Sequence, residues 1–223
     1  MIKHAAPFQD SDQHRAMRQA LVDIIAQKEI TSMAVLDAIR QVPRHFFVPP
    51  GVSPEEAYAD KALPIAEGQT ISQPYTVAYQ TQLLEVRAGQ KILEVGTGSG
   101  YQAAVLCWWP VSLYTIEYNN ALYTQAKQLL AELNYPVHTF HGDGSQGLPT
   151  YAPFDRILVT AGAPEVPEVL LQQLAIEGKM VIPVGKPKNQ QMLQITRKAT
   201  QEFDTELFDL FSFVPLLGKY GWK

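Results

Sequence analysis

The chain has 223 residues, of which 46% are hydrophobic and 18% are charged. This length and composition are typical of one globular domain with a full core, and they exclude a disordered chain or a coiled coil. Its 18 basic and 22 acidic residues give a net charge of −4, which excludes the broad basic surface of a general nucleic-acid-binding protein.

The first part of the chain combines two predicted helices with a long loop. Apolar residues recur at helical spacing between about residues 11 and 27, and Thr31 or Ser32 is placed to cap a second helix that runs through Ile39. Residues 43–74 are rich in proline and glycine and contain aromatic side chains, which predicts an ordered loop with a function.

From Thr76 onward, helical spacing leads into short apolar segments that alternate with further helical ones. Strands are predicted at 92–95, 113–117, 137–141, 156–160 and 180–184. Helices are predicted between them at 101–108, 120–133 and 165–175. This alternation is typical of an α/β fold with a doubly wound, mostly parallel sheet. Two more predicted strands give it an antiparallel finish, at 192–197 and 208–214.

A glycine-rich turn follows the first of these strands and opens a helix. Its spacing, Gly96-x-Gly98-x-Gly100, lets the backbone pass close to a ligand at the carboxyl end of the sheet. A dinucleotide fingerprint requires its third glycine one position later, where Tyr101 stands, so a pyrophosphate ligand is disfavoured. The chain also lacks the phosphate-binding run of nucleoside triphosphatases.

Two acidic residues end the strands that follow the turn. Glu117 ends the second strand, where a carboxylate can accept hydrogen bonds from both hydroxyls of a ribose. Asp143, next to Gly144, follows the third strand, where it can accept from an adenine amino group. A nucleoside without phosphates, beside a turn that admits an amino-acid group, indicates S-adenosylmethionine.

A series of short motifs follows in order along nearly the whole chain, from about residue 12 to Pro215. They are Pro43-Arg44-His45-Phe46-Phe47-Val48-Pro49, Gly68-Gln69-Thr70-Ile71-Ser72-Gln73-Pro74, the glycine turn, Gly142-Asp143-Gly144, Pro153-Phe154-Asp155, Val159-Thr160-Ala161-Gly162-Ala163-Pro164 and Val181-Ile182-Pro183-Val184-Gly185. This series resembles the protein-L-isoaspartate O-methyltransferases, a branch of the class I S-adenosylmethionine-dependent methyltransferases. The second motif is the most specific to that family.

The resemblance implies an enzyme of protein repair, which moves a methyl group from S-adenosylmethionine to the α-carboxylate of L-isoaspartyl residues in damaged proteins. It divides the single domain into residues 1–75, an N-terminal segment with the substrate motif, and residues 76–223, the cofactor-binding core. It places the hydroxyl of Ser72 at the substrate carboxylate, as an orienting group, with Thr70 and Ile71 lining the same site. The residues implied as cofactor contacts are Tyr75, Glu94, Gly96, Gly98, Ser99, Glu117, Asp143 and Gly144.

The residues by themselves also allow other functions. An S-adenosylmethionine-binding relative could act on another acceptor or serve as a non-catalytic binding module. Methylation of nucleic-acid amino groups is disfavoured, because Thr160–Pro164 lacks the Asn/Asp-Pro-Pro-aromatic motif after the fourth strand. Methylation at cytosine C5 needs a nucleophilic cysteine, and Cys107 lies in an apolar helical segment typical of a core. Trp108 and Trp109 are interpreted as packing residues.

The single cysteine and the five histidines bound the remaining chemistry. Cys107 has no partner for an intramolecular disulfide, and the histidines show no metal-ligand spacing, so no metal is expected. No run of about 18 apolar residues is present, and the first ten residues lack the pattern of a signal peptide. We therefore expect a cytoplasmic chain that binds neither membrane nor nucleic acid, with a monomer favoured and an oligomer left open.

Overall fold

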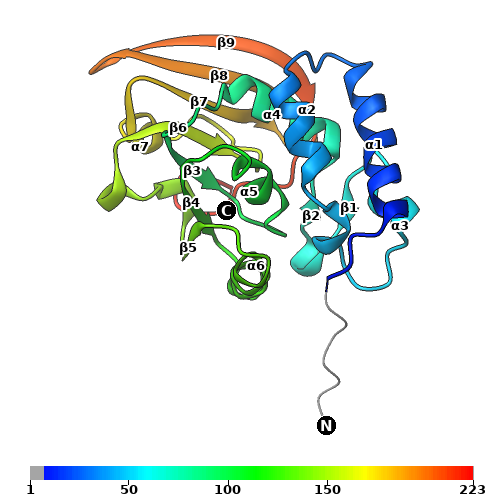
Figure 1. The fold of residues 1–223 in the computed structure, drawn as a ribbon. Helices are drawn as coiled ribbons and strands as arrows, with labels where there is room; N and C mark the ends of the chain where they lie inside the picture. The colour runs from blue at the N-terminus through cyan, green and yellow to red at the C-terminus, as the bar shows by residue number, and fades with distance from the viewer. Residues whose placement is uncertain (1–7, 223) are drawn as a thin grey trace.

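The apolar strand predicted before the glycine turn lies near the middle of a seven-stranded sheet (Figure 1). The computed structural model describes residues 8–222, so residues 1–7 and Lys223, which fall within the two predicted parts of the domain, lie outside the described residues. The order of the strands across the sheet is β5-β4-β3-β6-β7-β8-β9. Their bounds are β3 Lys91–Val95, β4 Ser112–Glu117, β5 Val137–His141, β6 Phe154–Val159, β7 Leu174–Lys186, β8 Asn189–Ala199 and β9 Glu202–Phe211.

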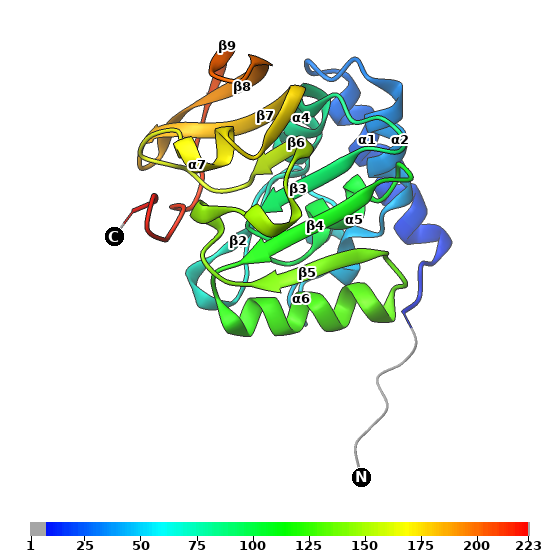
Figure 2. The same cartoon turned by 90° about the vertical axis from the view of Figure 1, so that its left-hand side faces the viewer.

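The direction of the strands confirms the predicted fold class. β3 pairs in parallel with β4 on one side and β6 on the other, so Ile92 lies between Leu113 and Arg156. β7 continues the parallel part, whereas β8 and β9 are antiparallel. Strand order reverses beside β3, and the carboxyl ends of β3, β4 and β5 meet at one edge of the sheet, on the left in Figure 2. Ligands of doubly wound sheets bind at such a reversal.

Helices cover both faces of the sheet. They are α1 Asp12–Ala26, α2 Met33–Gln41, α3 Pro54–Ala57, α4 Pro74–Leu84, α5 Tyr101–Leu106, α6 Asn120–Glu132 and α7 Glu168–Leu171. Ser11 and Ser32 cap α1 and α2, each accepting a hydrogen bond from the backbone N–H three residues later. Both helices pack on α4. The predicted division between residues 75 and 76 falls inside the first turn of α4, which begins at Pro74.

The predicted loop 43–74 is ordered and contains short elements of its own. Three are 3-10 or α-helical turns: η1 Arg44–Phe46, α3 and η2 Ala66–Gly68. The others are two short strands, β1 Leu63–Pro64 and β2 Thr70–Ile71, which pair antiparallel. Ser72 follows β2 directly, so this small hairpin places the substrate motif against the large sheet.

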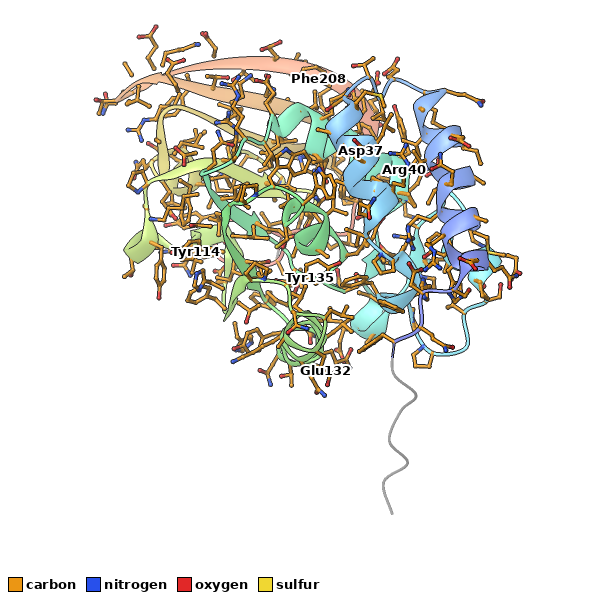
Figure 3. The ribbon with its side chains drawn as sticks, in the orientation of Figure 1. Asp37, Arg40, Tyr114, Glu132, Tyr135 and Phe208 are labelled. Carbon is orange, nitrogen blue, oxygen red and sulfur yellow. The ribbon has the colours of Figure 1, made fainter. Side chains whose placement is uncertain are left out.

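Two hydrophobic cores lie on the two faces of the sheet. The larger one joins α1, α2, α4 and α5 to β3 and β8, and it includes Leu21, Ile39 and Leu84, each at most 1% exposed. The smaller one lies between the sheet and α7 and includes Leu93 and Phe154. Phe208 on β9, labelled in Figure 3 near the helical side of the molecule, packs against the larger core. The N-terminal helices thus share a core with the sheet.

Three predicted elements differ from the structure, and the first is the strand expected at 180–184, which begins six residues earlier and runs over Leu174–Lys186. The helix expected at 165–175 is reduced to the four residues of α7, because Leu174 already pairs with Phe154 as the first residue of β7. The strand expected at 208–214 begins earlier, at Glu202, and ends at Phe211. Phe213 leaves the ladder because its backbone N–H donates to the buried side-chain oxygen of Gln190 (2.9 Å). No helix in the described part of the chain combines the length and the hydropathy that a membrane crossing requires.

Candidate active site

A cavity, called the first cavity here, opens at the carboxyl ends of β3 and β4. Its walls come from the hairpin, the glycine turn, the ends of β4 and β6, and the segment after β9. Among its lining residues are Thr70, Ile71, Ser72, Gly96, Gly98, Ser99, Gln102, Glu117, Gly144, Thr160 and Leu216. Most of the predicted site residues therefore meet in one place, although they lie far apart in the sequence.

The glycine turn brings its backbone close to the end of β6. Gly96 has a φ of +98°, and a Cβ added there would lie 2.5 Å from Oγ1 of Thr160. That hydroxyl donates to the carbonyl of Gly96 over 2.6 Å, so it cannot turn away without losing the bond. A side chain at position 96 is therefore excluded by backbone conformation and by contact.

Glu117 occupies the place that its position at the end of β4 predicts. It is 7% exposed and lines the first cavity. One carboxylate oxygen accepts from the backbone N–H of Gly98 (2.8 Å), and the other accepts from the backbone N–H of Asn119 (2.9 Å). Each oxygen can accept a second hydrogen bond, so the carboxylate can hold two ligand hydroxyls while it fixes the glycine turn.

Glu94 lies below the cavity, not in its wall. Its side chain is fully buried in β3, one oxygen accepts from the hydroxyl of Thr115 (2.5 Å), and the other has no partner among the described residues. Burial raises the pKa of this carboxyl from 4.5 to about 8. Glu94 is therefore mostly neutral at pH 7, and its predicted contact with the cofactor stays a prediction.

We expect Glu94→Gln to stabilise the protein at alkaline pH. The folded-state pKa is above the unfolded one, so the wild type loses stability as pH rises from 4.5 to about 8, whereas glutamine has no proton to lose. The melting temperature of the variant should exceed that of the wild type by roughly 10 °C above pH 8 and by little below pH 5. Scanning calorimetry across pH measures this. A difference that is constant with pH would contradict the assignment, and exposed Glu132→Gln is the control.

Asp143 lies at the end of β5 but outside the lining of the first cavity. Its carboxylate accepts four hydrogen bonds from its own chain: from the N–H and hydroxyl of Ser145, from the amide of Gln146 and from the backbone N–H of Lys219. These bonds lower the pKa of Asp143 against the opposing effect of burial, which is the largest single influence. Asp143 therefore anchors the C-terminal segment, and its contact with an adenine group stays a prediction.

A second cavity meets the first at the hairpin. It is lined by residues of the hairpin and of α4 together with Leu210–Val214, and it shares Thr70, Ser72, Thr160 and Val214 with the first cavity. Tyr75 lines the second cavity and not the first, with Nζ of Lys28 4.8 Å from its ring centroid. The predicted contact of Tyr75 with the cofactor stays a prediction.

Ser72 stands at the junction of the two cavities. Its side chain is half-buried, and within residues 8–222 its hydroxyl has no hydrogen-bond partner. Its backbone is held in place, because its carbonyl accepts from the guanidinium of Arg44 (3.0 Å). A hydroxyl that is fixed in position and free to donate suits an anionic group placed between the cavities.

Sequence reasoning missed Gln102 as a lining residue. Its amide nitrogen donates to Oγ1 of Thr81 (3.0 Å), and its carbonyl oxygen is buried beside the first cavity without a partner among the described residues. This unsatisfied acceptor can take a hydrogen bond from an ammonium group. Together with the carboxylate of Glu117 and the glycine turn, it fits S-adenosylmethionine, which carries ribose hydroxyls and an amino-acid ammonium. Only its position in the first turn of a helix after the glycines could have indicated it.

Three side chains with metal-ligating atoms lie together in the N-terminal segment, from the start of α1 and from η1. The ligand atoms of Asp10, His14 and His45 are within 4.8 Å of one another. Both carboxylate oxygens of Asp10 already accept from Arg18, and Nδ1 of His45 lies 2.6 Å from the hydroxyl of Tyr58. This group is therefore an ion-paired network that links Asp10 and η1 to α1. The guanidinium of Arg18 occupies the place that a metal ion would take beside Asp10.

The residues interpreted as core packing also have defined places. Cys107 packs against the larger core, and burial raises the pKa of its thiol to about 12, which leaves it without nucleophilic character at neutral pH. Trp109 packs against the same core, whereas Trp108 is 43% exposed.

Known proteins are similar to this chain in sequence and in fold. A family model described as protein-L-isoaspartate(D-aspartate) O-methyltransferase matches residues 16–221. The protein-L-isoaspartate O-methyltransferase of Cytophaga hutchinsonii is 50% identical and covers 97% of each chain. That of Christiangramia forsetii is 51% identical and covers 94% of this chain and 98% of its own.

Solved structures agree with the fold. One protein-L-isoaspartate O-methyltransferase superposes with a TM-score of 0.84 at 27% identity, covering 92% of this chain and 67% of that one. A Plasmodium falciparum protein, solved in complex with S-adenosyl-L-homocysteine, superposes with a TM-score of 0.79 at 24% identity, covering 90% and 98%. With the family model and two relatives matching almost the whole chain, this chain belongs to the protein-L-isoaspartate(D-aspartate) O-methyltransferase family.

Proposed function

We propose that the two cavities divide the work of methyl transfer, with the cofactor in the first and the isoaspartyl residue in the second. The family makes this chain an enzyme that uses S-adenosylmethionine and acts on L-isoaspartyl residues of damaged proteins. The observation that carries the proposal is the junction at Thr70, Ser72, Thr160 and Val214, which belongs to both cavities. A transferred group needs such a shared boundary.

The acceptor requires no general base. A carboxylate has a pKa near 4, so it is already an anion at neutral pH and can attack a carbon directly. When bound, S-adenosylmethionine supplies the methyl group, activated by its positive sulfur. The chain has to align the reacting atoms and exclude water, and alignment alone can lower the barrier by several kcal/mol.

The hydroxyl of Ser72 is assigned to hold the substrate carboxylate. It is free to donate, and a hydrogen bond to an ionised group is about twice as strong as a neutral one. Thr70 and Ile71 line the first cavity beside it, and the pairing of β1 with β2 sets the position of all three residues. Ser72 therefore orients the nucleophile of the substrate and is not a nucleophile itself.

The cofactor residues lie on the other side of the junction. Glu117 would hold the two ribose hydroxyls, and the turn with Gly96, Gly98 and Ser99 would lie along the amino-acid group. Gly144 lines the same cavity, and a side chain at this position is excluded because its Cβ would lie 2.7 Å from a methyl carbon of Val95. The buried oxygen of Gln102 adds an acceptor for the ammonium group.

We further propose that the chain works as a monomer on protein substrates. The edge strand of the sheet, β9, supports this, because it carries exposed Glu202, Asp204, Glu206 and Asp209. Acidic residues along an edge strand disfavour pairing with a second copy. Sedimentation equilibrium of the purified chain tests the state, and a stable dimer would contradict it.

The activity itself is tested by methyl transfer from labelled S-adenosylmethionine to a synthetic isoaspartyl peptide. We expect incorporation into this peptide and none into the matched peptide with an ordinary aspartyl residue. The label should be released at alkaline pH, as a methyl ester is. Binding of S-adenosylhomocysteine without incorporation into either peptide would instead support a binding module or another acceptor.

A further inference from the structure

Arg44 is buried without an acidic partner. Its side chain is 0% exposed, and among the described residues no carboxylate lies within ion-pair distance of its guanidinium. Burial lowers its pKa to about 10, so the group is still charged at neutral pH. A buried cation is costly unless hydrogen bonds and dipoles compensate it, so the partners of this one are informative.

The guanidinium donates to three backbone carbonyls, two in the segment 57–61 and one at Ser72. Nε donates to Ala57 at the end of α3 (3.0 Å), and one terminal nitrogen donates to Lys61 before the hairpin (3.2 Å). The other terminal nitrogen donates to the carbonyl of Ser72, at the junction of the cavities (3.0 Å). Only the planar fork of an arginine offers donors in these directions at once.

Arg44 also contacts a wall of the first cavity. Its guanidinium carbon lies 5.0 Å from the ring centroid of Tyr101, which is the first residue of α5 after the glycine turn. Tyr101 lines the first cavity, is 2% exposed, and its hydroxyl has no partner among the described residues. A cation over an aromatic face in a dry site is a favourable contact. One side chain therefore contacts both Ser72, at the junction of the two cavities, and Tyr101, directly after the glycine turn.

A second polar contact holds the other side of the same segment. The carboxylate of Asp60 accepts from the backbone N–H of Tyr75 (2.8 Å) and from the side-chain amide of Gln73 (3.1 Å). It also pairs with Lys28. Residues 57–61 are thus bound to residues 72–75 from two directions, and of the two contacts only Arg44 reaches the backbone of Ser72 itself.

We propose that Arg44 is a positioning residue for methyl transfer. By holding the carbonyl of Ser72 and the ring of Tyr101 together, it sets the place of the Ser72 hydroxyl relative to the first cavity. This inference rests on the proposed function, and in particular on the role of Ser72. Arg44 does not itself line either cavity, so it acts through Ser72 and not on the substrate.

The test is Arg44→Lys, which keeps the charge but cannot reach three carbonyls. We expect the kcat for an isoaspartyl peptide to fall by about tenfold to a hundredfold, because small displacements of orienting groups are costly in rate. The affinity for S-adenosylhomocysteine, measured by calorimetry, should stay within about threefold of the wild type. Arg44→Gln, which removes the buried charge, gives a second variant if the lysine one folds poorly.

Arg18→Lys is the matched control. Arg18 is also a buried arginine, 5% exposed, and it donates to Asp10, to the hydroxyl of Tyr58 and to the carbonyl of Arg40. It has no contact with Ser72, so its replacement should change the melting temperature without a comparable change in kcat. Equal losses of kcat in the two lysine variants would overturn the positioning role.

A double-mutant cycle separates positioning from general support of the fold. In the background of Ser72→Ala, Arg44→Lys should lower kcat by at most about twofold, because the hydroxyl that it positions is gone. A loss as large as in the wild-type background would overturn the inference. Methylguanidinium added to Arg44→Ala should restore kcat along with the melting temperature, and restoration of the melting temperature alone would contradict it.

The outcomes for the function and for Arg44 differ. Failure of the wild-type chain to methylate any isoaspartyl peptide would overturn the proposed function. If the wild type methylates the peptide and Arg44→Lys and Arg44→Gln do so at the same rate, only the role of Arg44 is overturned.

Discussion

Ser72→Ala is expected to lower methylation of an isoaspartyl peptide by tenfold or more and to leave cofactor affinity unchanged. A hydrogen bond to a charged group contributes about 1.5–3 kcal/mol, and each 1.4 kcal/mol corresponds to a factor of about ten in rate. The Ser72 hydroxyl is free to donate at the junction of the cavities, and the methyl of alanine fits the same space. Steady-state kinetics with labelled cofactor measure the rate, and calorimetry with S-adenosylhomocysteine measures the affinity.

Two further variants make this result specific. Ser72→Thr keeps the hydroxyl and should retain more activity than the alanine variant. Ser112→Ala removes an exposed hydroxyl at the start of β4, at the opposite end of that strand from the first cavity, and should behave as the wild type. Unchanged turnover in Ser72→Ala would remove Ser72 from the mechanism, whatever the affinity for the cofactor.

Glu117→Ala is expected to weaken the binding of S-adenosylhomocysteine by about a hundredfold. Two ribose hydroxyls lose a charged acceptor, and each such hydrogen bond contributes about 1.5–3 kcal/mol before solvent competes. The backbone N–H of Gly98 also loses the carboxylate that holds the glycine turn (2.8 Å). Calorimetry measures the dissociation constant, and the rate at saturating cofactor shows how far the chemistry itself survives.

Graded substitutions check the assignment of Glu117. Glu117→Gln keeps one oxygen acceptor without the charge, so its affinity should lie between those of the alanine variant and the wild type. Glu132 is the last residue of α6, at the end of that helix away from Glu117, and it is labelled in Figure 3. Glu132→Ala removes an exposed carboxylate and should leave binding unchanged. Wild-type affinity in Glu117→Ala would show that the ribose is held elsewhere.

Local patterns were sufficient for most of the fold. The strand Lys91–Val95, the helix Asn120–Glu132 and the strand Val137–His141 lie within one or two residues of their predictions, because apolar periodicity reports directly on a buried strand or helix face. The region after Pro164 was less regular. There, Leu174 joins β7 through its pairing with Phe154, and pairing between distant strands leaves no periodic signal in either one.

The predicted site shows the same division. Gly96, Gly98 and Glu117 could be placed because a strand end and a glycine turn are local features of the sequence. The partners of Glu94 and Asp143 could not be placed in this way, because they come from Thr115 on the neighbouring strand and from Lys219 near the other end of the chain. A carboxylate seen in a sequence does not show which donors will reach it.

The sequence by itself determined the doubly wound sheet, the glycine turn and the family to which the chain belongs. These follow from periodicity, spacing and short motifs, which need no knowledge of distant contacts. Only the tertiary structure decided that Ser72, Thr160 and Val214 form one junction, and that the guanidinium of Arg44 donates a hydrogen bond to the carbonyl of Ser72 there. Those positions depend on how a hairpin, a sheet edge and a buried cation close together, and long-range closure of this kind is set by packing across the whole fold.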